Sequence, residues 1–178
     1  FVWSNFGLLH SPQFRVAVTV RFDLDQPLSR WQIALQNCDG LPLKAIRFPR
    51  LLNLRDQTGE QLAVPLWVGQ QAENPRQILR TAKGEPKRLE WNYPGLLSLQ
   101  CLAVANRDGP GLYAACDDAG DFLKDFAVFG TANAAMNFEI RHRPELPAVA
   151  ARDYTLPYSI VLGTFHGDWF EAAQIYRA

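Results

Sequence analysis

The chain has 178 residues, the size of one domain that can bury a full hydrophobic core. Hydrophobic residues make up 48% of it and charged residues 20%, and 18 basic residues balance 18 acidic ones. The zero net charge gives no electrostatic basis for binding nucleic acid or an anionic membrane, and no apolar run approaches the roughly 18 residues of a membrane span.

Apolar and polar residues alternate with a period of two along most of the chain, which predicts strands. Segment 14–24 (FRVAVTVRFDL) places six apolar residues on one face, namely Phe14, Val16, Val18, Val20, Phe22 and Leu24. Segment 31–37 (WQIALQN) repeats the pattern. Further strands are expected at 44–48, 62–68, 77–81, 88–93, 96–105, 111–116, 121–129, 135–142 and 158–165. Pro65 predicts an edge or a bulge in its strand.

Turn signals separate these segments at short intervals: Asp39-Gly40, Thr58-Gly59, Lys83-Gly84 and the run 108–111 (DGPG). Many antiparallel strands joined by Gly and Pro turns are typical of a sandwich or barrel rather than of βαβ units. The predicted fold class is therefore mainly β, an antiparallel β-sandwich in a single domain spanning 1–178.

One hairpin is predicted about the loop 106–111 (NRDGPG). If Ala105 lies opposite Leu112, then Cys101 lies opposite Cys116. We expect both thiols to be reduced and buried, because the cross-strand position strains a disulfide. Cys38 has no evident partner.

The last residues predict a short helix capped by Asp168. Trp169, Ala172, Ala173 and Tyr176 share its apolar face, and we expect it to dock through Trp169. No stop signal follows.

The chain also begins without Met, on the apolar residues Phe1, Val2 and Trp3. We therefore expect it to be a piece of a longer protein.

No metal or nucleotide motif is recognisable. His10, His142 and His166 are scattered, with no spacing typical of metal ligands. No GxSxG, GxxxxGK[ST] or GxGxxG motif occurs. His142 is expected in the core or at its rim. These patterns favour a binding or supporting domain without metal, cofactor or catalytic residues.

Aromatic and charged residues gather in the middle of the chain, namely Trp91, Tyr93, Asp117, Asp118 and Lys124. Aromatic rings can stack on the C–H faces of sugars while carboxylates bind the hydroxyls. The alternative is that the rings pack in a strand and the two aspartates form a solvated turn.

Segments 91–126 (WNYPGLLSLQCLAVANRDGPGLYAACDDAGDFLKDF) and 156–178 (LPYSIVLGTFHGDWFEAAQIYRA) resemble a group of bacterial glycoside-hydrolase-like proteins, and 31–51 resembles an earlier part of that group. In the group a β-rich N-terminal domain precedes a (β/α) barrel. The resemblance implies a supersandwich similar to galactose mutarotases, with a short C-terminal helix leading into a barrel after residue 178.

By that resemblance, the chain is a non-catalytic domain that packs on the barrel of the same polypeptide and lines its carbohydrate cleft. Trp91 and Tyr93 would stack on the sugar, and Asp118 and Lys124 would contact hydroxyls or each other. Hydrolysis needs two carboxylates at a set separation, so no hydrolase activity is expected of this domain alone.

Two alternatives stay open. The domain could bind carbohydrate by itself or act as a mutarotase, with His142 and Glu139, or His166 and Asp168, as the acid-base pair. It could also be a structural spacer whose aromatic residues all lie in the core.

Overall fold

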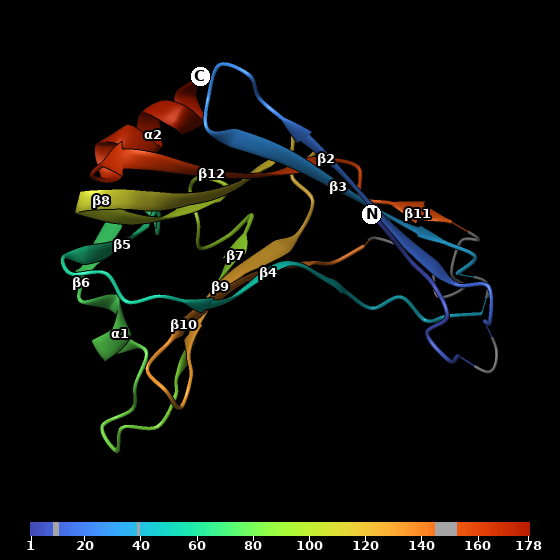
Figure 1. Cartoon of the computed structure of the whole chain (residues 1–178), viewed down its shortest axis with the longest axis horizontal. Coiled ribbons are helices and arrows are strands. Elements are labelled where there is room, and N and C mark those ends of the chain that lie inside the picture. Colours follow the sequence, from blue (N-terminus) through green and yellow to red (C-terminus); the bar gives the residue numbers. More distant parts are fainter. Residues whose placement is uncertain (9–10, 39, 145–152) are drawn as a thin grey trace.

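The computed structural model describes residues 1–8, 11–38, 40–144 and 153–178. They form two antiparallel sheets that lie as two layers in Figure 1. The first sheet contains, in spatial order, β1 (Val2–Trp3), β2 (Arg15–Phe22), β3 (Leu28–Gln36), β12 (Ser159–Gly167), β8 (Cys101–Asp117), β5 (Glu60–Val64) and β6 (Gln70–Glu73), with β11 (Tyr154–Thr155) beside β3. The second contains β4 (Ile46–Leu54), β10 (Met136–His142), β9 (Lys124–Gly130) and β7 (Arg88–Tyr93). The predicted mainly β, antiparallel class is confirmed, and the arrangement is consistent with a β-sandwich.

The main core lies between the two sheets, where the predicted alternation buries one face of each strand. Its fully enclosed side chains include Leu62, Phe126, Ile140 and Ile160. The alternation extends less far than predicted at the end of β2. Phe22 is 76% exposed and Leu24 is 97% exposed, because the strand ends at Phe22 before the turn into β3.

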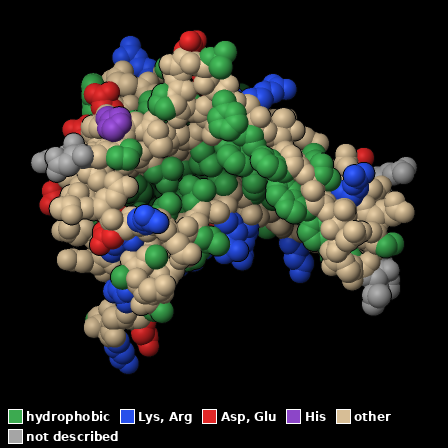
Figure 2. Space-filling view, viewed as in Figure 1, with side chains coloured by type: hydrophobic (Ala, Val, Ile, Leu, Met, Phe, Trp, Pro, Cys, Tyr) green, Lys and Arg blue, Asp and Glu red, His purple; other side chains and the backbone are tan. Residues whose placement is uncertain are grey.

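The sandwich is open on one side. Figure 2 shows a hollow in this face of the molecule, and hydrophobic side chains line it. A cavity of about 160 Å³ lies where β5 and β8 meet the ends of β4 and β10. The side chains of Val104, Leu112 and Met136 contribute to its wall. The two sheets thus leave apolar surface uncovered between them.

The predicted hairpin is present, but its register differs by one residue. The first half of β8 pairs with β5 and the second half pairs with β12, and the Cys116 N–H donates to the Gln100 carbonyl at 3.0 Å. Cys101 therefore does not lie opposite Cys116. Cys116 packs between the two sheets, whereas Cys101 packs on the outer face of the first sheet. A slip of one residue moves every side chain of a strand to the other face.

Cys101 and Cys116 are buried and form no disulfide, as predicted, and Cys38 is likewise buried and outside any disulfide. Burial raises the pKa of the Cys101 thiol to about 12 and raises that of Cys116 as well. We expect all three thiols to react with a disulfide reagent at pH 8 after unfolding and less than one to react within minutes in the native protein. Rapid reaction of two or more native thiols would contradict this placement.

Two helices accompany the sheets. α2 (Trp169–Arg177) begins as predicted, with the Asp168 side chain accepting the Phe170 N–H at 2.8 Å. α1 (Pro75–Ile78) occupies the start of a segment predicted as strand. Pro75 suits the first turn of a helix, and Asn74 turns the chain in a left-handed conformation just before it.

α2 docks on the outer face of the first sheet through the side that carries Ala172, Ile175 and Tyr176. Ala172 is buried, and Ile175 and Tyr176 pack against the same cluster as Ala103. Trp169 is 50% exposed, so the prediction that the helix docks through this residue is wrong. The small Ala172 side chain lets the helix approach the sheet closely, while Trp169 lies at the edge of this contact.

The predicted strand at 62–68 ends early. β5 stops at Val64, directly before Pro65, and Trp67 has a positive φ of 53°. Because proline cannot donate to the ladder, the chain leaves the sheet here and turns into β6. In the described parts of the chain, no helix has the length and apolar character that crossing a membrane requires.

Candidate functional site

Three of the four residues predicted to contact sugar meet in the core. Tyr93 and Lys124 are partners across β7 and β9, and Asp118 follows the end of β8. Lys124 Nζ lies 2.5 Å from Asp118 Oδ2 and 2.8 Å from Gln100 Oε1. The ammonium also lies 5.0 Å from the ring centre of Tyr93 and 4.6 Å from that of Tyr158. We call these five residues the lysine cage.

The lysine cage has nearly all its polar groups paired. Asp118 accepts the N–H groups of Gly120 and Phe122 at 2.8 Å each, in addition to the ammonium. The Lys124 side chain is 0% exposed and that of Asp118 is 1% exposed. Asp118 and Lys124 therefore contact each other, and neither has surface that a sugar could touch in this conformation. The pair ties the first sheet to the second.

Trp91 and Tyr93 keep part of their surface. Both lie on the inner face of β7 and pack against the main core from its edge. The Tyr93 hydroxyl donates to Asp121 Oδ1 at 2.7 Å, and this hydrogen bond, with burial, raises the pKa of Tyr93 to about 12. Tyr93 is thus fixed from two sides, by Lys124 and by Asp121.

The lysine cage could have been predicted from the position of Lys124 in the sequence. Along β9, Lys124 alternates in phase with the core residues Phe126 and Val128. A lysine at an inward position needs a buried anion.

His142 is a core residue, as predicted. Its Nε2 faces the Phe48 carbonyl at 2.5 Å and its Nδ1 faces the Tyr158 hydroxyl at 2.7 Å. A carbonyl can only accept, so Nε2 carries the proton and Nδ1 accepts from the hydroxyl. Burial raises the pKa of Tyr158 and lowers the pKa of His142 to about 4.

The two acid-base pairs suggested by the sequence are differently placed. His142 faces the core, whereas Glu139 binds arginines on the outer face of the same strand, so this pair does not meet. His166 and Asp168 are both exposed, and Asp168 caps α2.

Burial of neutral His142 makes stability depend on pH. The unfolded histidine takes up a proton as the pH falls through about 6.5, but the folded one does so only near pH 4. The free energy of unfolding therefore decreases as the pH falls from about 6.5 to about 4, by up to about 3 kcal/mol. Urea unfolding at pH 7 and at pH 4 should show this loss, and His142→Gln should lack most of it. Parallel pH profiles for the two proteins would contradict it.

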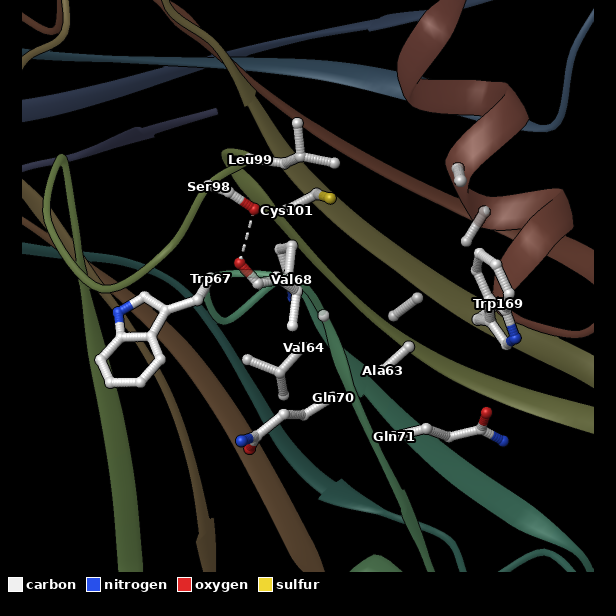
Figure 3. A pocket seen from close by; sticks show the side chains of 15 residues that line it. Ala63, Val64, Trp67, Val68, Gln70, Gln71, Ser98, Leu99, Cys101 and Trp169 are labelled. Carbon is white, nitrogen blue, oxygen red and sulfur yellow. Dashed lines mark hydrogen bonds between the residues drawn. The ribbon is translucent and has the colours of Figure 1, made fainter.

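A groove of about 480 Å³ lies beside α2. Figure 3 shows Trp67 and Trp169 at its two ends and Val64, Leu99 and Cys101 between them. Gln70 and Gln71 lie along one side, and the Ser98 hydroxyl donates to the Pro65 carbonyl at 2.9 Å. The other lining residues are small or apolar, namely Ala63, Pro65, Val68, Gly69, Ala103, Ala172 and Ala173.

The apolar rim of this groove is strongly exposed. Trp67 is 71% exposed, Val68 is fully exposed and Trp169 is 50% exposed. Phe170, whose ring lies against that of Trp169, is 51% exposed. Sequence reasoning assigned Trp67 and Val68 to a strand and so missed the groove. The signal was the pair Pro65 and Gly69, which brackets a turn rather than a strand.

The described residues contain no group of three His, Cys, Asp or Glu side chains placed to hold a metal ion. His10 and Asp39 lie outside the described residues. A scan against protein-family models matches no family, and a search of curated proteins finds no relative.

Proposed function

We propose that the chain is a non-catalytic β-sandwich domain of a glycoside-hydrolase-like protein, and that it packs on a (β/α) barrel of the same polypeptide. The resemblance of segments 91–126 and 156–178 supports the identity of the partner. The observation that carries the docking is the groove beside α2 with its exposed rim. A contiguous apolar patch of this kind on a soluble domain is typical of an interaction surface.

The energetic gain from covering this rim is substantial. A tryptophan offers roughly 200 Å² of surface, and Trp67 exposes 71% of its own. Complete burial at about 25 cal/mol/Å² gains about 3.5 kcal/mol from this ring alone.

Carbohydrate contact is the second part of the proposal. Trp91 and Tyr93 would stack on a sugar at the edge of the core, and Asp118 and Lys124 would hold Tyr93 in place from behind. The partly exposed aromatic rings support this division of roles.

The test is a binding measurement between this chain and the barrel. The coding sequence beyond Ala178 should encode alternating strands and helices with Asp or Glu at strand ends. That segment, expressed separately, should bind this chain by calorimetry, and Trp67→Ser with Val68→Ser should weaken binding at least tenfold.

The matched control is Phe22→Ser with Leu24→Ser, which removes equally exposed apolar residues at the end of β2. It should leave binding unchanged. A downstream sequence without a barrel pattern, or equal losses in both variants, would refute the proposed docking.

A further inference from the structure

The outer face of the second sheet carries a network of charged side chains, which we call the arginine layer. It consists of five arginines and three carboxylates, namely Arg47, Arg50, Arg88, Arg141, Arg143, Glu90, Asp125 and Glu139. These residues alternate along their strands with core residues such as Phe126 and Ile140. The arginine layer therefore faces away from the first sheet and from the groove beside α2.

Two of the three carboxylates, Glu139 and Asp125, lie underneath the arginines, whereas Glu90 is 28% exposed. The side chain of Glu139 is 1% exposed and that of Asp125 is 3% exposed, although both stand on the outer face. Glu139 accepts from Arg50 Nε at 3.0 Å and from an Arg88 terminal nitrogen at 2.7 Å, and Arg47 Nε lies 3.8 Å away. One negative charge thus holds three guanidinium groups.

The arginine layer has two positive charges in excess, in a chain whose net charge is zero. The excess lies toward the β4 edge, where Arg47 is 58% exposed and Arg50 is 47% exposed. Arg50 donates to Glu139 through Nε, and Arg47 Nε lies near the same carboxylate; among the described residues the terminal amino groups of these two arginines make no hydrogen bond. These donors remain available on the surface.

We propose that the arginine layer binds an acidic segment of a protein partner, with Arg47 and Arg50 receiving its Asp or Glu carboxylates. The guanidinium fork matches a carboxylate in two parallel hydrogen bonds. Glu139 already restrains these arginines, which lowers the entropy lost when they bind. Arginine is also enriched at protein interfaces.

The charge pattern distinguishes this partner from other anions. Nucleic acid presents closely spaced phosphates, which the three interspersed carboxylates would repel, and the two excess charges suffice for only one or two anionic contacts. A small ligand needs a concave site. The two cavities described above are lined by residues outside the arginine layer.

Fluorescence anisotropy with a labelled hexaglutamate peptide tests the proposal. The native protein should bind it in 20 mM NaCl and at least tenfold more weakly in 300 mM NaCl. Arg47→Gln with Arg50→Gln should reduce the affinity at least tenfold. Arg15→Gln with Arg21→Gln removes the same charge from the exposed face of β2 and should change it less than twofold.

Circular dichroism should show that both double variants are folded. If Arg47→Gln with Arg50→Gln unfolds, Arg47→Gln alone replaces it in the binding measurement, because the ion pair of Arg47 with Glu139 is the longest in the arginine layer. Equal losses of affinity in the two double variants would mean that only the net charge of the protein matters, and would overturn the proposal. So would tighter binding of a DNA or heparin oligomer through the same arginines. Because this surface is separate from the groove, neither result affects the proposed docking on a barrel.

Discussion

Replacement of Lys124 by methionine should lower the free energy of unfolding by about 3–5 kcal/mol, because it leaves the Asp118 carboxylate buried without its cation. The Lys124 ammonium also binds Gln100 and lies against two tyrosine rings, so several contacts are lost together. Urea unfolding followed by tryptophan fluorescence measures the change. Lys83→Met, at an exposed position, should cost less than about 0.5 kcal/mol.

A double-mutant cycle separates the ion pair from simple packing. Asp118→Asn alone should also destabilise the protein, since it leaves the Lys124 ammonium unpaired. The double variant Lys124→Met with Asp118→Asn should cost clearly less than the sum of the two single changes. The prediction rests on the 2.5 Å contact between the two residues. Additive losses of unfolding free energy would mean that they act independently and would contradict it.

Phe126→Ala should cost about 3–5 kcal/mol in unfolding free energy, because it opens a cavity between the sheets. Phe126 is 0% exposed and lies opposite Trp91 on one neighbouring strand and Ile140 on the other. Phe22→Ala is the matched control, since this ring is 76% exposed and should cost less than about 1 kcal/mol.

The same urea titration serves both phenylalanine variants, and their m-values should agree. Similar losses of unfolding free energy in Phe126→Ala and Phe22→Ala would contradict the placement of Phe126 in the core.

The candidate site was only partly predictable. Tyr93, Asp118 and Lys124 were selected from the sequence as neighbours in one cluster, and the structure brings them together around one ammonium. The burial of Asp118 and Lys124 was not predicted, because turn residues near Asp118 were interpreted as surface. The groove beside α2 was not found at all. It needs β5, β8 and α2, which are separated in sequence and meet only in the folded domain.

Local chemistry alone determined the strands with strict alternation, such as β2, the hairpin loop between the halves of β8, and the start of α2 at Asp168. Each depends on residues within a few positions of one another. The register of the hairpin was decided by tertiary structure. The loop permits pairings that differ by one residue, and only burial of Cys116 between the sheets and of Cys101 on the outer face of the first sheet selects one. The docking end of α2 was decided in the same way, because Ala172 and Tyr176 find a surface on β8 and Trp169 does not.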